Sequence, residues 1–225
     1  MTSIWKRIAS AAVLCAGILG ANSNAQAFEA GDFIVRLRGL ALVPTSSGVG
    51  LRNGFPNGGL RAQNDYVPEI DFTYMFTNNI GAELIVATSK HRFKGTGTLK
   101  GIGNAATARV LPPSLTFQYH FMPKSTIKPY LGLGINYTIM YMENASPSLE
   151  AALGPTDVRA SHSVGFVAQA GVDIKLDDRW SINLDVKYIR MKTDITLKSG
   201  NTTRRIDVDI NPVILGAGIV YRFKT

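Results

Sequence analysis

Three side chains that could form a hydrolytic triad lie close together in the sequence. Ser89 and His91 are two residues apart, and Glu83 would share their face of an extended strand. A Ser-His-acid triad needs mutual hydrogen bonds, but six residues of strand separate Glu83 from Ser89 by about 20 Å. The histidines His91, His120 and His162 are scattered and lack the spacing of metal ligands. The sequence therefore favours a protein without catalytic, cofactor or metal chemistry over an enzyme.

Charged residues at alternating positions could instead form a buried network of ion pairs. Arg36 and Glu83 lie in segments where every second residue is apolar, so charged and apolar side chains must point to opposite faces. Charges are stable away from water only when they are paired and hydrogen-bonded. We predict a polar plug inside the fold, formed by Arg36, Glu83, His120, Lys128, Asp173, Asp185 and Arg222, with Asp32 and Lys187 beside them.

Alternation of apolar and polar residues recurs along the whole chain and predicts the strands that position these groups. The alternating segments are residues 33–43, 66–76, 80–86, 111–121, 131–141, 164–174, 182–188 and 213–223. Aromatic residues gather near the segment ends on the apolar face, as expected at the two interfaces of a membrane. These aromatic residues are Tyr66, Phe76, Tyr119, Phe121, Tyr141, Trp180, Tyr188, Tyr221 and Phe223.

The connections between these segments alternate in length. The short ones are residues 77–79, 122–126 and 176–178, and the long ones are about 44–65, 92–108, 143–160 and 192–204. Tight periplasmic turns alternating with longer extracellular loops are typical of transmembrane barrels. We therefore predict an all-β fold, an eight-stranded antiparallel transmembrane β-barrel in the outer membrane of a Gram-negative cell, with both termini on the periplasmic side.

Residues 1–27 are predicted to be a secretory signal peptide. Two basic residues precede an uncharged apolar run at 8–20, and small residues follow before a cleavage point ahead of Phe28. The run holds about twelve apolar residues, whereas a spanning helix needs roughly 20. Residues 28–225 would then form a single barrel domain.

The remaining composition narrows the class of protein. The 225-residue chain has a net charge of +8, and its one cysteine, Cys15, lies within the predicted signal peptide. The exported barrel would therefore contain no disulfide. A basic chain could bind nucleic acid, but export excludes that partner. We expect its partners to be outer-membrane lipid, lipopolysaccharide, small hydrophobic solutes, periplasmic chaperones and the barrel-assembly machinery.

Several motifs resemble those of one known family. They are Asp71-Phe72-Thr73-Tyr74, the Leu111–Phe121 block with its two adjacent prolines, Lys128–Tyr137, and Asp207–Pro212. Together they resemble the outer membrane protein W (OmpW/AlkL) family over nearly all of the predicted mature chain. The resemblance implies an eight-stranded barrel with a narrow, apolar channel for small hydrophobic molecules; some relatives are colicin receptors. Asn211 stands where such proteins often carry an aspartate.

The inward positions suggest how such a channel would be lined. The expected apolar lining, toward the outer half of the barrel, is Leu40, Leu42, Val67, Ile85, Met140, Met142, Ile189 and Met191. The charged set lies at mid-height or below, so an apolar solute would have to leave sideways through the wall. The alternative is that the apolar residues only pack a closed core.

Two adjacent prolines mark the expected exit. Proline lacks the N–H that a strand ladder needs, so Pro112 and Pro113 must interrupt pairing. We predict a lateral window there; the alternative is a bulge outside the hydrocarbon layer. A different function stays open beside transport: a receptor or structural barrel whose basic outer connections contact lipopolysaccharide, either specifically or as simple solvated charge.

Overall fold

The computed structural model describes residues 28–45, 57–98 and 100–224. The predicted signal peptide and its Cys15 lie outside the described residues, as does residue range 46–56 with Arg52. No helix in the described ranges has the length and apolar character needed to cross a membrane.

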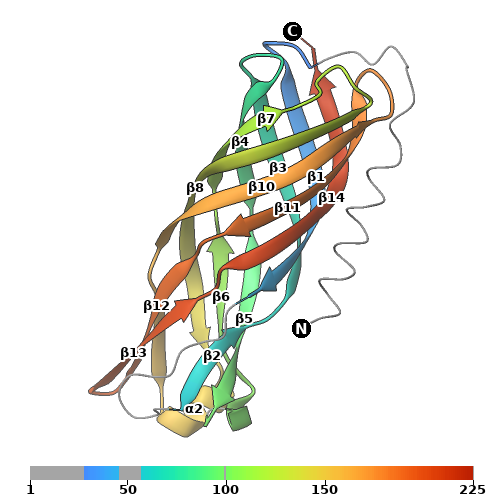
Figure 1. The fold of residues 1–225 in the computed structure, drawn as a ribbon. Helices are drawn as coiled ribbons and strands as arrows, with labels where there is room; N and C mark the ends of the chain where they lie inside the picture. Colours follow the sequence, from blue (N-terminus) through green and yellow to red (C-terminus); the bar gives the residue numbers. More distant parts are fainter. Residues whose placement is uncertain (1–27, 46–56, 99, 225) are drawn as a thin grey trace.

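Eight antiparallel strands close into one barrel (Figure 1). Around the ring, they run in the order β1, β3, β4, β7, β8, β10, β11 and β14, and β14 pairs with β1 to complete the circle. Their bounds are β1 Phe33–Pro44, β3 Asp65–Met75, β4 Ile80–Ala87, β7 Ser114–His120, β8 Ile127–Ala145, β10 Ser163–Lys175, β11 Trp180–Ile189 and β14 Pro212–Phe223. The predicted fold class is confirmed.

Alternating side chains explain why these segments form a barrel wall. In β7, Leu115, Phe117 and Tyr119 are exposed while the residues between them are buried. The same pattern gives every barrel strand an outer face with large apolar residues. Such a surface is stable against acyl chains, because each backbone N–H and C=O along a closed ladder finds a partner within the sheet.

One end of the barrel is closed by short turns, which we call the turn end. Between β10 and β11, the Asp177 carboxylate accepts hydrogen bonds from the backbone N–H groups of Arg179 and Trp180, both at 2.8 Å. These two bonds stabilise the ionised form and lower the pKa of Asp177. Strand β14 also ends here, at the top of Figure 1.

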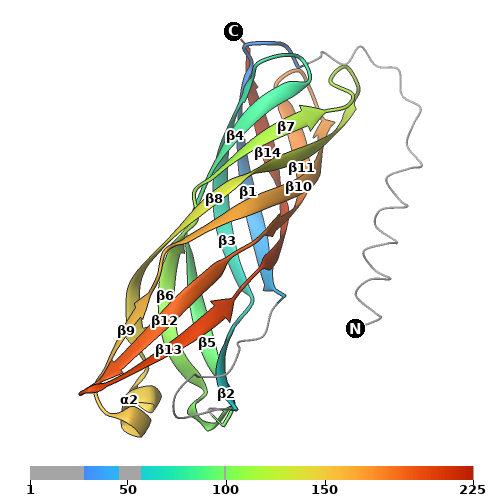
Figure 2. The same cartoon turned by 60° about the vertical axis from the view of Figure 1, so that its left-hand side comes forward.

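The opposite end carries a long extension, best seen in Figure 2. It contains β2 Gly58–Ala62, β5 Ser89–Gly97, the short 3-10 helix Lys100–Ile102, β6 Asn104–Leu111, α2 Pro147–Leu153, β9 Thr156–Ala160, β12 Lys192–Ser199 and β13 Thr202–Asp209. One sheet joins β2, β5 and β6 to the outer part of β8, and a second joins β9, β12 and β13.

The sequence predicts that the long connections are loops, and this prediction is wrong in part because most of them contain strands. Ile195 and Leu197 alternate with polar residues in β12 and are buried, so the strand pattern continues beyond the barrel. The buried apolar core runs with it, from the outer half of the lumen into the extension.

Candidate functional site

A dense network of charges fills the half of the barrel nearer the turn end. At its centre, the Arg36 guanidinium donates to Asp173 at 2.9 and 3.3 Å and to Asp71 at 3.2 Å. All three side chains are fully buried. One cation thus bridges carboxylates from β3 and β10, on opposite arcs of the ring, and ties the wall together across the lumen.

A second layer lies one step toward the extension. Arg38 contacts the carboxylates of Glu69, Asp71 and Glu83 at 2.6 to 3.0 Å. Lys187 bridges Glu69 at 3.1 Å and Asp185 at 2.9 Å. Together with Arg36, this makes three buried cations. They face five buried carboxylates, Glu69, Asp71, Glu83, Asp173 and Asp185, so each cation lies between opposite charges.

Neutral groups complete the hydrogen bonds of this network. Glu83 accepts from the hydroxyl of Thr116 at 2.9 Å and from the amide of Gln169 at 2.7 Å. The Tyr130 hydroxyl donates to Asp185 at 2.9 Å. Glu83 is therefore held by the network, away from the role of a catalytic acid toward Ser89.

Aromatic and cationic groups close the lumen at the turn end. The ring of Phe28 is buried, with the Lys128 ammonium 4.3 Å from its centre and the His120 ring packed edge-on at 5.2 Å. Arg222 contacts Asp32 at 2.6 Å beside them. Phe28 is also the residue that signal cleavage would leave first.

Every residue of the predicted polar plug faces the interior and is buried. Lys187, predicted beside the plug, is part of the network. The prediction omitted six other members: Arg38, Glu69, Asp71, Tyr130, Gln169 and Asn183. All of these occupy inward positions of their strands, so the alternation pattern could have identified them. What the pattern could not supply is which residue meets which across the lumen.

Between the network and the extension lies one apolar cluster. Six of the eight residues predicted to line a channel belong to it: Leu40, Leu42, Val67, Met140, Ile189 and Met191. Ile85 is also buried and lines the small cavity beside the cluster. The side chain of Met142 lies outside the described part of the chain. Phe93, Ile195 and Leu197 belong to the same cluster, so it continues from the barrel into the extension.

A small cavity lies where the apolar cluster meets the charges. Its volume is about 20 Å³, and its wall includes Leu40, Ile85 and Ile189 together with the charged pair Glu69 and Lys187. Pro112 and Ser114 form its side toward the barrel wall. A volume of this size holds about one water molecule, so a larger guest needs side chains to move.

The wall is interrupted beside this cavity. Pairing between β4 and β7 ends at Ile85 and Ser114, and pairing between β5 and β6 starts at Ser89 and Val110. The residues between these pairs, 86–88 on one strand and 111–113 on the other, have no register partner across the gap. The two prolines thus interrupt the ladder as their missing N–H groups require.

The interruption is open to grooves on both sides. On the outside, a groove of about 310 Å³ is lined by Leu84, Pro113, Leu115 and Tyr137, among others. Pro112 contacts the inner cavity, Pro113 the outer groove, and Ser114 both. A wall about one residue thick therefore separates the lumen from the lipid-facing surface at this point.

Asn136 of β8 closes the gap. Its side-chain amide lies 3.2 Å from the carbonyl oxygens of both Pro112 and Pro113 and 2.9 Å from the Ser114 hydroxyl. The Thr138 hydroxyl donates to the Asn136 carbonyl oxygen at 2.6 Å and fixes the orientation of the amide. The Pro113 carbonyl also accepts from the Tyr137 backbone N–H at 3.0 Å, and the Pro112 carbonyl from the Ser114 hydroxyl at 3.1 Å. Asn136 thus adds a second donor to each carbonyl at the broken ladder.

Asn136→Ala should lower the free energy of unfolding by about 1–3 kcal/mol, because the buried bonds of the amide to Pro112, Pro113 and Ser114 would be lost and the Thr138 hydroxyl would lose this acceptor. The urea unfolding midpoint of the barrel measures this change. Asn201→Ala, in the exposed turn after β12, is the matched control and should change the midpoint little. Equal midpoints for the two variants would show that Asn136 does not hold the gap.

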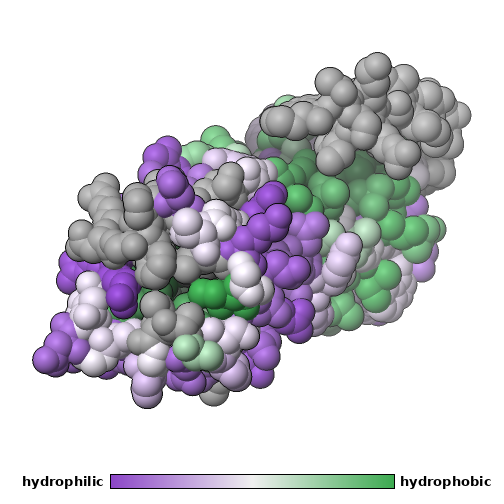
Figure 3. Space-filling view, turned by 90° about the horizontal axis from the view of Figure 1, so that it is seen from below, coloured by the Kyte–Doolittle hydropathy of each residue, from purple (hydrophilic) through white to green (hydrophobic). Residues whose placement is uncertain are grey.

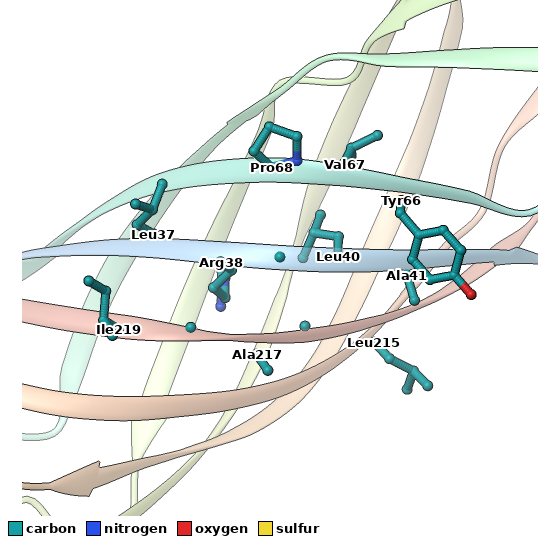
Figure 4. Close-up of a pocket in the computed structure, with 13 residues that line it drawn as sticks. Leu37, Arg38, Leu40, Ala41, Tyr66, Val67, Pro68, Leu215, Ala217 and Ile219 are labelled. Atoms are coloured by element: carbon teal, nitrogen blue, oxygen red, sulfur yellow. The ribbon is translucent and has the colours of Figure 1, made fainter.

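A further recess, of about 780 Å³, lies on the outer wall across β14, β1 and β3 (Figure 4). The small residues Gly39, Ala41 and Ala217 form its floor, and the larger side chains of Leu37 and Ile219 lie at its margin. These positions face outward, so the recess belongs to the lipid-facing surface and not to the lumen.

Within the described ranges, no group of three histidine, cysteine or acidic residues could hold a metal ion.

Comparison with known proteins places this architecture among outer-membrane barrels. The family model described as OmpW family matches residues 29–223. Outer membrane protein W of Vibrio cholerae is 33% identical over 211 residues, which span 92% of this chain and 96% of that protein.

Solved structures agree in fold. The crystal structure of the outer membrane protein OprG from Pseudomonas aeruginosa aligns with a TM-score of 0.81 and 28% identity, over 88% of this chain and 99% of that one. The solid-state NMR structure of outer membrane protein AlkL in DMPC lipid bilayers aligns with a TM-score of 0.70, over 92% and 96% of the two chains. At 23% identity, AlkL supports the fold alone.

Proposed function

Because the chain belongs to the OmpW family and forms a closed barrel of the Gram-negative outer membrane, we propose that it is a channel for the passive uptake of small hydrophobic molecules. The lining would be the apolar cluster that begins with Leu40 and Leu42, including Met142. The exit would be the interrupted wall at Pro112 and Pro113.

The distribution of charge supports entry from outside and opposes passage straight through. An apolar solute among Val67, Met140 and Met191 leaves water without displacing any charge. To continue toward the turn end, the solute would have to separate pairs such as Arg36 and Asp173. Leaving one buried charge without its partner costs about 3–5 kcal/mol, and the network contains several such pairs.

The observation that carries the proposal is the thin wall at the prolines. The inner cavity and the outer groove meet across Ser114, at the height where apolar lining gives way to charge. A solute stopped by Glu69 and Lys187 therefore has a sideways route into the acyl chains. Opening needs side-chain movement, and Met140 and Met191 are flexible enough to repack around a guest.

The proposal includes the other expectations on export and partners. We propose that residues 1–27 are removed as a signal peptide, that chaperones and the assembly machinery deliver the barrel, and that lipopolysaccharide surrounds its outer face. We also propose that it has no catalytic activity. A receptor or structural barrel without transport is the alternative function, and it would need no route through the wall.

Uptake of a hydrophobic fluorescent probe into cells separates the two functions. Cells that carry the barrel should take up N-phenyl-1-naphthylamine faster than cells that lack it, because the apolar route bypasses the polar outer leaflet. A charged dye of similar size should enter both at the same rate. Equal uptake of the hydrophobic probe would favour the receptor and contradict the channel.

A further inference from the structure

The charge of the outer extension is distributed unevenly between its two sheets. Strands β2, β5 and β6 contain five lysine and arginine residues and no aspartate or glutamate. Strands β9, β12 and β13 also contain five, but with four aspartates among them. Ion pairs such as Arg159 with Asp157 and Lys192 with Asp209 balance that second sheet.

The five cations of the first sheet lie on one face. Lys90, Arg92 and Lys94 are exposed alternate residues of β5, so they point to the same side. Arg109 is the register partner of Lys90, and Arg61 is the register partner of Lys94. We call this set, Arg61, Lys90, Arg92, Lys94 and Arg109, the basic stripe.

The stripe is unfavourable for the protein alone. Like charges directly opposite each other in an antiparallel pair destabilise a sheet, and two such pairs occur here. Among the described side chains, no carboxylate forms an ion pair with any member of the stripe. Cations that repel one another and form no ion pair with a described carboxylate favour an external anion.

The position of the stripe identifies the source of that anion. Along one outward-facing ribbon, the exposed positions read Leu84, Val86, Thr88 and then Lys90, so the apolar band ends one position before the stripe begins. The Thr88 hydroxyl lies 3.1 Å from the Tyr141 hydroxyl at this boundary. Tyrosine at this level is typical of the membrane interface.

The upper end of the stripe is also hollowed. A recess of about 660 Å³ is lined by Arg61, Lys94 and Lys100, and no acidic residue contributes to its wall. Figure 3, which views the molecule from this end, shows hydrophilic side chains over much of the extension and the hydrophobic wall behind it.

We propose that the basic stripe binds the phosphate groups of lipopolysaccharide in the outer leaflet. Lys90 and Arg109 would meet phosphates at the headgroup level, and the recess at Arg61 and Lys94 would accept anionic groups farther out, in the sugar core. Arginine and lysine form short, charge-assisted hydrogen bonds with phosphate oxygens. This inference assigns a surface to the lipopolysaccharide contact proposed above, and it does not depend on transport.

Two triple variants of the full barrel test the assignment. Lys90→Gln, Arg92→Gln and Lys94→Gln together remove three charges from the stripe. Arg159→Gln, Lys192→Gln and Lys198→Gln together remove three charges from the balanced sheet and serve as the control. Binding of phosphorylated rough lipopolysaccharide to the purified barrel is measured in detergent. The stripe variant should bind about tenfold more weakly than the control, equivalent to about 1.4 kcal/mol.

Further arms identify the anion. The same lipopolysaccharide after removal of its phosphates should bind the wild type as weakly as phosphorylated lipopolysaccharide binds the stripe variant. The variant with Lys90→Arg and Lys94→Arg should bind like the wild type, and heat-dependent gel mobility shows that each variant is folded. Equal weakening by both triple variants would overturn the proposal, as would undiminished binding without phosphate. Full displacement by inorganic phosphate would indicate a free-anion site instead of a lipid site.

Hydrophobic probe uptake in the stripe variant keeps this proposal separate from the channel. We expect uptake close to that of the control variant, because the stripe lies outside the wall and the lining residues are unchanged. Loss of lipopolysaccharide binding with normal uptake would support the stripe alone. Weakened binding by the stripe variant alone, together with absent uptake in every variant and in the wild type, would contradict the channel and leave the stripe intact.

Discussion

Arg36→Met is expected to lower the free energy of unfolding of the barrel by about 3–5 kcal/mol, because it leaves carboxylates uncompensated in a dry interior. Asp173 would lose its two bonds to the guanidinium, and Asp71 would keep only its contact with Arg38. Methionine fills much of the arginine volume, so the change reports charge more than packing. Urea unfolding of the barrel in detergent, followed by heat-dependent gel mobility, measures it.

The control is an ion pair of similar geometry in a wetter place. Lys175 contacts Asp178 at 2.9 Å near the turn between β10 and β11, where the aspartate is exposed. Lys175→Met should cost no more than about 1 kcal/mol, because water screens and replaces that pair. Adding Asp173→Asn to Arg36→Met should recover part of the loss. An Arg36→Met barrel as stable as the Lys175→Met barrel would contradict a network that depends on charge pairing.

The fold could be predicted because a barrel wall reports its two faces in the sequence. Leu115 and Phe117 alternate with Thr116 and Gln118, and this parity fixes which side meets lipid wherever the strand is. The lengths of the connections then fixed the direction of the chain through the membrane. Neither inference required knowledge of which strand residues are paired.

The contacts within the lumen could not be predicted in this way. Arg36 and Asp173 are 137 residues apart, and their contact depends on strand tilt and register around the whole ring. Parity places Tyr130 inward, but only the register places its hydroxyl 2.9 Å from Asp185. The network is thus a property of closure, whereas its membership is a property of each strand.

The outer extension escaped prediction for a different reason. Its strands carry polar residues on the outer face and apolar residues only on the buried face. The prediction relied on large apolar residues that face lipid, so β9 and β12 were predicted as polar connections. The backbone conformation of Asn211 is a second feature that the alternation pattern could not predict. Its φ of 38° lies in the left-handed region that asparagine tolerates better than most residues, and its side chain accepts a bond from the Met191 N–H.

Replacing both prolines of the interruption, by Pro112→Thr and Pro113→Val, is expected to slow uptake of the hydrophobic probe by about tenfold or more. Each substitution restores a backbone N–H and a β-branched side chain, so the ladder between residues 86–88 and 111–113 can close. Each new hydrogen bond contributes about 0.5–1.5 kcal/mol, and a solute leaving sideways would have to break both. Initial rates of dye fluorescence in cells measure the effect.

Pro147→Ala, at the first position of α2 in the extension, removes a proline without altering the wall and should leave uptake unchanged. The two substitutions should also stabilise the barrel, since they add ladder bonds across a gap in the register between residues 86–88 and 111–113. The predicted combination, a more stable barrel that transports less, is not expected from damage to the fold. Unchanged uptake in a folded double variant would show that apolar solutes do not leave through this part of the wall, whatever the barrel transports.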